Sequence, residues 1–206
     1  MLLLGFLTAL PLATVLPQSW GWENGFLEDA QVFILLAGCL TAVWAGLRQS
    51  DAAARASWWA AALVWLILAG RELAWGAAFM PPMGFDDHGP IISSRVLWYR
   101  PAVPWVCAGL LLVALISMWQ SKAFSRFVMR LLRERAWPWM TVALIAACVT
   151  MSAISEGHGK LHVPMMDVSA LIVAEEVFET WAYIGIWLAQ WQLIRHAARW
   201  ARSLYY

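Results

Sequence analysis

The stretch LIVAEEVFETWAYIGIWLAQWQLI, residues 171–194, is apolar enough to cross a bilayer, yet its first half carries Glu175, Glu176 and Glu179. A membrane-spanning helix needs about 20 mostly apolar residues, and this stretch is long enough. Ionisable groups in hydrocarbon cost free energy and usually mark a function. The stretch therefore predicts a membrane helix with a polar face turned toward the interior of a bundle.

The composition of the whole chain agrees with a membrane protein. Of its 206 residues, 62% are hydrophobic and only 13% are charged, whereas soluble domains are about 45–50% apolar and about 25% charged. The chain also has 16 tryptophans, a residue that prefers bilayer interfaces. The formal net charge of +1 argues against a nucleic-acid partner, which would require a basic surface.

Apolar segments predict an all-α membrane protein, a bundle of six transmembrane helices in a single domain covering residues 1–206. The segments are Leu2–Pro17, Phe26–Leu47, Ser57–Met80, Pro101–Trp119, Pro138–Ser155 and Val168–Ile194. The segment 1–17 is short and contains Pro11, so it is either the first helix or a signal segment. If it is cleaved, five helices remain.

The basic residues predict the orientation of the bundle. Ten of the 14 lie in the segments 48–55 and 120–137 and in the tail after Ile194. Cytoplasmic loops collect Lys and Arg, so both termini are expected on the cytoplasmic side. The expected location is the bacterial inner membrane.

The acidic residues follow the opposite pattern and gather toward the outer side. At 1.5 Å per residue, Glu72 is expected about 12 Å below the outer surface, and Glu175 and Glu179 about 10 and 16 Å below it. Glu175 and Glu179 are i,i+4 neighbours on one helix face. These positions predict an acidic cavity inside the bundle that opens to the periplasm.

Three glutamates, Glu72, Glu175 and Glu179, are the candidate catalytic residues of this cavity, because burial can tune a carboxyl group for acid–base chemistry. Arg71 is the expected counter-ion for one carboxylate. The supporting residues are Arg71, Glu28, Glu176 and Trp75. The structural alternative is that protonated glutamates form hydrogen bonds between helices and only hold the packing.

Histidines in two outer loops predict a divalent metal such as zinc. The candidate ligands are His88, Glu156, His158 and His162, which offer imidazole and carboxylate groups of the kind that zinc uses. Gly157 and Gly159 disfavour a helix there, so the spacing logic of a helical zinc motif does not apply. The structural alternative is an ordinary solvated loop.

Three short motifs resemble a set found in small multi-pass bacterial inner-membrane proteins. They are GRELAWGAAF (70–79), ENGFLED (23–29) and EEVFETWAY (175–183). In that family an R/E-E-x-x-W-G helix accompanies a later E-E-x-x-E helix. The resemblance links Glu72, Trp75, Gly76 and the three glutamates of 175–179 as one set, and it implies no particular reaction.

A second motif, WGWENGFLE (20–28), is similar to the acidic calcium-binding stretch of alkaline-ceramidase-type intramembrane hydrolases. That family holds its zinc with histidines in helices. Here the last predicted helix carries glutamates and the loop histidines lie elsewhere. The resemblance implies only how a metal-dependent amidase can be built inside a helix bundle.

Three functions fit these observations. The first is a metal-dependent hydrolase or transferase that acts on a lipid or lipid-linked substrate near the headgroup level. The second is a proton or cation transporter that uses the same carboxylates. The third is a non-catalytic partner or assembly subunit, bound to another membrane protein or to a second copy of this chain.

Overall fold

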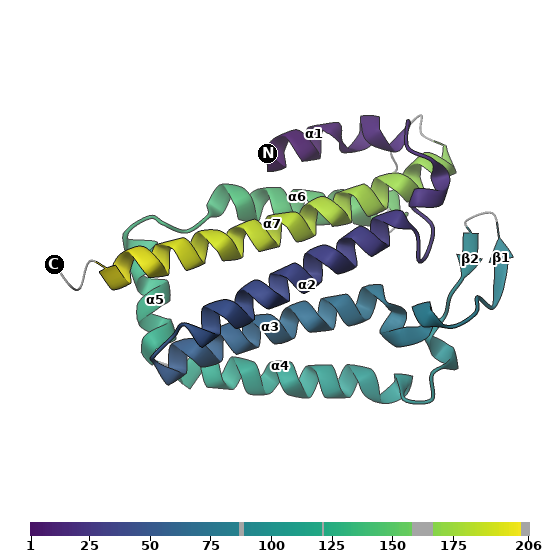
Figure 1. Cartoon of the computed structure of the whole chain (residues 1–206). Coiled ribbons are helices and arrows are strands. Elements are labelled where there is room, and N and C mark those ends of the chain that lie inside the picture. The colour runs from purple at the N-terminus through teal and green to yellow at the C-terminus, as the bar shows by residue number, and fades with distance from the viewer. Residues whose placement is uncertain (87–88, 121, 158–166, 203–206) are drawn as a thin grey trace.

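The structure, a computed structural model, describes residues 1–206 except 87–88, 121, 158–166 and 203–206, and it is mostly helical (Figure 1). The α-helices are α1 (Leu2–Ala13), α2 (Phe26–Leu47), α3 (Ala52–Glu72), α4 (Val103–Gln120), α5 (Lys122–Arg133), α6 (Trp139–Ser155) and α7 (Val168–Arg202). Short 3₁₀ turns are η1 (Gln18–Trp20), η2 (Ala74–Phe79), η3 (Ser94–Val96) and η4 (Arg100–Ala102).

A short hairpin follows η2, formed by β1 (Gly84–Asp86) and β2 (Gly89–Ile91). The strands are antiparallel, with Gly84 opposite Ile91 and Asp86 opposite Gly89. The sequence did not predict this hairpin. It stands at the end of the bundle where α2 begins and α3 ends (Figure 1).

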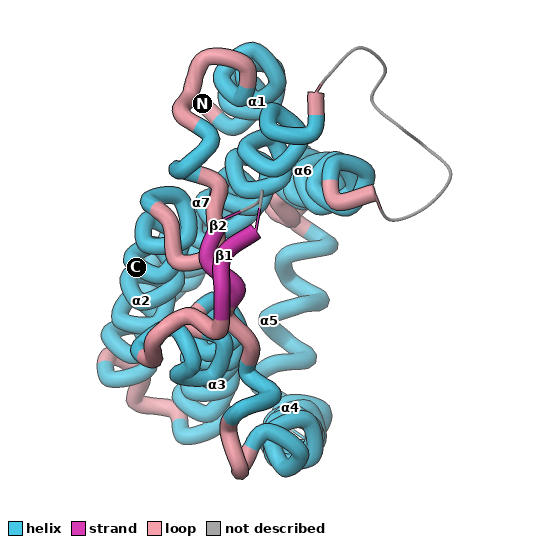
Figure 2. The backbone as a smooth tube through the Cα atoms, turned by 90° about the vertical axis from the view of Figure 1, so that its right-hand side faces the viewer, coloured by secondary structure: helices cyan, strands magenta, loops and turns pink. Residues whose placement is uncertain are grey.

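Helix α7 is the centre of the arrangement and packs against α1, α2 and α6. Helix α2 also packs against α3, and α3 against α4. Helix α5 lies across the end of the bundle opposite the hairpin and connects α4 to α6 (Figures 1 and 2). We call the end near the hairpin the acidic end, because Glu28 lies in the first turn of α2 and Glu72 ends α3 there. Helix α5 crosses the opposite end.

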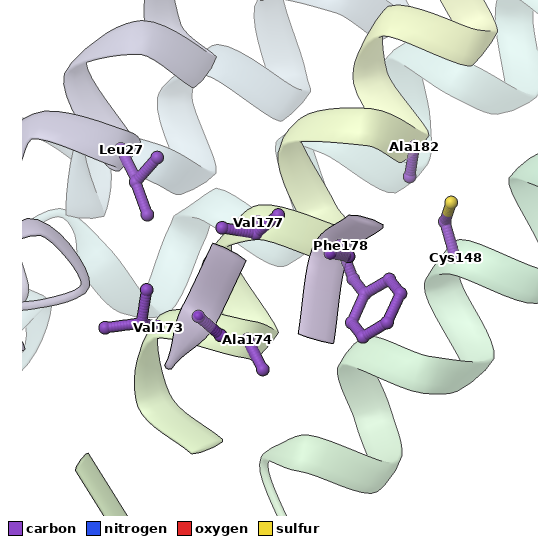
Figure 3. Packing of buried hydrophobic residues seen from close by; sticks show 9 residues of the cluster. Leu27, Cys148, Val173, Ala174, Val177, Phe178 and Ala182 are labelled. Carbon is purple, nitrogen blue, oxygen red and sulfur yellow. The ribbon is translucent and has the colours of Figure 1, made fainter. Parts of the chain in front are cut away.

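The core consists of two clusters that meet on α7. One joins α1, α2, α6 and α7 and contains Phe178, Leu27, Cys148 and Val177 (Figure 3). The other joins α2, α3 and α7 around Trp65. Both contain several Ala residues, and small residues let helix backbones approach closely.

Two glycines show how closely the helices approach. Gly5 of α1 lies directly under the Trp181 ring of α7, where any Cβ would overlap the indole. A Cβ on Gly38 of α2 would stand 2.5 Å from the Trp65 ring of α3. A neighbouring tryptophan therefore leaves no room for a side chain at either position.

Within the described residues, two helical segments, Phe26–Leu47 and Arg100–Trp119, are long and apolar enough to cross a membrane. No position of the second is buried within its most apolar 18-residue window, so α4 displays leucine, valine and isoleucine on its outside. Helices α1 and α6 are apolar but shorter. The six-helix transmembrane bundle, with both termini on one side, stays a prediction.

Several predicted boundaries need correction. The expected helix 57–80 begins at Ala52, where Asp51 caps it by accepting a hydrogen bond from the Ala54 amide (2.8 Å), and it ends at Glu72. The expected loop 120–137 contains helix α5, and the last helix continues beyond Ile194 to Arg202. The α5 sequence has an apolar and a basic face, which is the pattern of a helix that lies at an interface.

Candidate functional site

A cavity of about 360 Å³ opens at the acidic end, between the first turn of α2, the last turn of α3 and the first half of α7. Its lining contains seven carboxylate side chains: Glu23, Glu28, Glu72, Glu156, Glu175, Glu176 and Glu179. Among the lining residues Arg71 alone is basic. The structure thus brings all three candidate catalytic glutamates to the wall of one acidic cavity, together with Arg71, Glu28 and Glu176.

The helix period explains part of this convergence. On α7, Glu175 and Glu179 are one turn apart on the same face, and Glu176 is turned about 100° from Glu175. Glu28 lies in the first turn of α2 and Glu72 is the last residue of α3. Glu28 and Glu72 therefore lie at helix ends. The other three glutamates lie on α7, which passes both of these ends.

A tight turn ends α3 just after Glu72. Ala74, Trp75 and Gly76 all have positive φ (44°, 59° and 106°), a conformation that costs free energy in residues other than glycine. The Tyr99 hydroxyl donates to the Trp75 carbonyl at 2.7 Å. The Trp75 ring folds back over Gly70, where a Cβ would stand 2.8 Å from it. Trp75 is thus part of the turn that follows Glu72.

The early end of α3 corrects the predicted depth of Glu72, which lies at the helix terminus and not two turns below it. Its side chain is nevertheless only 6% exposed. The Tyr183 hydroxyl of α7 donates to Glu72 Oε1 at 2.7 Å. Burial here comes from neighbouring side chains such as Tyr183 and not from distance along the helix.

Arg71, the expected counter-ion of one carboxylate, contacts two glutamates. Its Nη2 lies 3.1 Å from Glu179 Oε1, and its Nε lies 3.6 Å from Glu72 Oε1. Ser152 of α6 also donates to Glu179 Oε1, at 3.3 Å. The Arg71 side chain is 59% exposed, so it contacts buried Glu72 and half-buried Glu179 while one face stays open to a ligand.

The other carboxylates have contacts within the scaffold. Buried Gln31 of α2 donates to Glu176 Oε2 at 2.7 Å and links α2 to α7. Glu28 accepts from the Asn24 amide at 2.6 Å, and Glu23 accepts from the Ile92 amide at 2.7 Å. These three glutamates therefore connect parts of the cavity wall and also contribute carboxylates to it.

A second hollow, of about 470 Å³, continues from the acidic cavity. The two share Arg71, Glu156 and Glu179 in their linings. We call the second hollow the apolar groove, because the rest of its wall, between α3 and α6 and along α7, is mostly apolar. That wall consists of Leu68, Val149, Ser152, Ala153, Ala182, Tyr183 and Ile186.

The metal prediction falls mainly outside the described residues, since His88, His158 and His162 are not among them. Glu156 is described and caps the end of α6, where it lines both hollows. Within the described part of the chain no three His, Cys, Asp or Glu residues are grouped to hold a metal ion. The donors that this part does supply are carboxylate oxygens, the ligand type that hard divalent cations prefer.

Sequence reasoning missed three residues of the site: Tyr183, Ser152 and Gln31. Tyr183 follows Glu175 and Glu179 at the same four-residue spacing, so the helix period alone placed it on the carboxylate face. Ser152 and Gln31 carry no comparable signal, because their roles depend on which faces of α2, α6 and α7 meet.

Comparison with known proteins gives no match: no family model, no curated protein and no solved structure is similar to this chain. The fold and the site define a mostly helical protein with an acidic cavity at one end, and its chemistry is inferred from its own residues.

Proposed function

We propose that the chain is an integral protein of the bacterial inner membrane, with the acidic cavity facing the periplasm. We further propose that it is a metal-dependent hydrolase or transferase for a lipid or lipid-linked substrate. The observation that carries this proposal is the junction of the acidic cavity with the apolar groove at Arg71 and Glu179. A polar site joined to an apolar groove matches a molecule with a polar headgroup and an acyl chain.

The charge of the cavity supports a bound cation. Seven carboxylates and a single guanidinium line it, and neighbouring carboxylates disfavour one another's ionisation unless a cation lies among them. A divalent metal bound there would polarise a carbonyl or phosphoryl oxygen and activate water. Carboxylates of the cavity would hold it, with His88, His158 and His162 as the proposed imidazole ligands.

The residues at the junction and beside it would bind the headgroup, take a proton from water and orient the carboxylates. Arg71 is held by Glu72 and Glu179 and keeps an exposed face, so its guanidinium would bind an anionic headgroup with paired hydrogen bonds. Glu175 lines the cavity one turn from Glu179 and would take the proton of the attacking water. Tyr183 and Ser152 orient Glu72 and Glu179 by donating to them.

Purified full-length protein tests the proposal directly. Metal content is measured by mass spectrometry, and hydrolysis is followed on phosphatidylglycerol, phosphatidylethanolamine, ceramide and a polyprenyl diphosphate. We expect bound divalent metal and activity on one lipid class, both lost after chelation, and Glu175→Gln should lower activity by about 10²-fold or more. Glu134→Gln, at the opposite end, is the matched control. His158→Ala and His162→Ala should lower metal content and activity together.

Tolerance of Gln at positions 72, 175 and 179, with both histidines dispensable, would contradict the catalytic proposal. It would leave a structural role or a partner-binding subunit.

A cation transporter is the second candidate. It is favoured by a buried polar chain below the cavity, in which Gln190 of α7 donates to Thr41 at 2.6 Å and accepts from Trp65 at 2.6 Å. Proton or cation flux in liposomes would select this function. A flux that stops in Gln190→Leu and persists in Glu134→Gln would separate transport from hydrolysis.

A further inference from the structure

A third hollow, about 670 Å³ in volume, lies at the end of the bundle that α5 crosses and shares no lining residue with the acidic cavity. It lies between α3, α5 and α7, with Met118 of α4 at its wall. Most of the lining is apolar and includes Trp58, Ala61, Phe127 and Leu193. A hollow of this volume and apolar lining has room for an acyl chain.

Two of the three charged residues that line this hollow, which we call the arginine groove, are basic. Arg126 and Arg130 of α5 both line it. Asp51 also lines it, but its carboxylate caps α3 by accepting from the Ala54 amide at 2.8 Å. Arg130 lies over the Trp200 ring, 4.6 Å from its centroid, and its Nε contacts Glu134 at 2.7 Å. A guanidinium has five N–H donors, so the Nε contact leaves others to a ligand.

The position of α5 indicates which kind of ligand the arginine groove binds. Helix α5 lies across the bundle end (Figures 1 and 2), and a basic amphipathic helix in this orientation lies in the plane of the lipid headgroups. Its arginines then stand at headgroup level and the apolar lining lies beneath them. Basic sites between helices on the cytoplasmic face bind anionic lipid headgroups.

We propose that the arginine groove is a binding site for an anionic phospholipid, with the phosphate on Arg126 and Arg130 and one acyl chain in the apolar lining. The site rests on the membrane location in the proposed function but not on its chemistry. Loss of activity in Glu175→Gln would leave this lipid site unchanged.

Lipid competition on the full-length protein tests this proposal. The protein in detergent is titrated with phosphatidylglycerol and phosphatidylcholine of identical acyl chains, and bound lipid is counted by native mass spectrometry. We expect one lipid to be retained with a preference for phosphatidylglycerol. Each arginine near a headgroup favours the anionic lipid about fivefold, so Arg126→Ala should reduce the preference by about that factor and Arg126→Lys should largely restore it.

Two further variants separate the groove from general surface charge. Arg55→Ala removes the same charge from the same end but outside the groove lining, and it should keep the full preference. Ala197→Phe places a ring in the groove without changing charge, and it should weaken retention of both lipids. Equal retention of the two lipids by the wild type, or an equal loss in Arg55→Ala and Arg126→Ala, would overturn the proposal. Circular dichroism on each variant confirms that it is folded.

Discussion

The two ends of the helical bundle use their charged residues in opposite ways. At the acidic end the carboxylates turn inward, where Glu72, Glu176 and Glu179 accept hydrogen bonds from buried or half-buried side chains of neighbouring helices. At the other end the arginines stay on the surface and lie over indole rings: Arg48 over Trp44 at 4.1 Å and Arg195 over Trp191 at 5.8 Å.

The difference follows from the chemistry of the side chains. A long arginine chain can cover apolar surface while its guanidinium remains in the headgroup region. A glutamate is too short for this, so a carboxylate on a membrane helix needs partners inside the protein. Inward carboxylates therefore form a cavity, whereas in the proposed membrane placement the outward arginines meet lipid headgroups.

The membrane orientation is the prediction with the largest effect, because a wrong orientation would overturn the comparison between the two ends of the bundle. Reporters fused after Tyr206 and within residues 120–137 should read cytoplasmic, and one near Gly159 should read periplasmic, because basic residues set the orientation. The measurement is all-or-none, with alkaline phosphatase and green fluorescent protein as paired reporters. Both ends on the same side of the membrane would contradict the proposed placement of the cavity.

Next in size is the effect of Glu179→Gln, which keeps the shape of the side chain but removes its charge. In an active site it should lower activity by about 10²-fold or more while thermal stability stays nearly unchanged. Glu179→Leu removes the acceptor for Arg71 and Ser152 as well, and should also lower the free energy of unfolding by about 1–3 kcal/mol. A silent Glu179→Gln beside a destabilised Glu179→Leu would assign Glu179 to packing alone.

Helix packing between the two ends can be tested at a pair of glycines. Gly38→Ala places a Cβ against Trp65, a ring held by its hydrogen bond to Gln190, and should destabilise the protein by about 1–3 kcal/mol. Gly109→Ala is the control, since nothing lies within 4 Å of its Cβ position. It should be neutral or more stable by up to about 1 kcal/mol. Thermal unfolding in detergent measures both, and equal effects would show that α2 and α3 do not meet at Gly38.

The smallest expected effect concerns Glu134, at the end crossed by α5. Hydrogen bonds from Arg130 and Trp200, Arg130 first, lower the pKa of this carboxyl below its usual range. A lowered pKa in the folded state adds stability above the unfolded pKa, and that stability disappears as the pH falls through the folded value. The melting temperatures of wild type and Glu134→Gln should therefore differ slightly at pH 7 and converge in acid. A difference that grows in acid would contradict the assigned pair.

Much of the secondary structure could be predicted from the sequence. The bounds expected for Phe26–Leu47 agree with α2, because an acidic first turn and a long apolar run mark a helix by local signals alone. The start of α3 and the helix α5 were missed although signals existed, an Asp51 cap and arginines spaced at four residues. The end of α3 at Glu72 carried no such signal, since its turn depends on Tyr99 and Gly70.

The sequence by itself determined that this protein is apolar and helical, that α7 carries Glu175 and Glu179 on one face, and that Arg71 stands beside Glu72. These properties depend on composition and on the helix period, which are local. Tertiary structure alone decided that Tyr183 meets Glu72, that Ser152 meets Glu179 and that Gln31 meets Glu176. The physical reason is that small residues determine which helix faces can approach each other. The sequence of one helix does not show where the neighbouring helix lies.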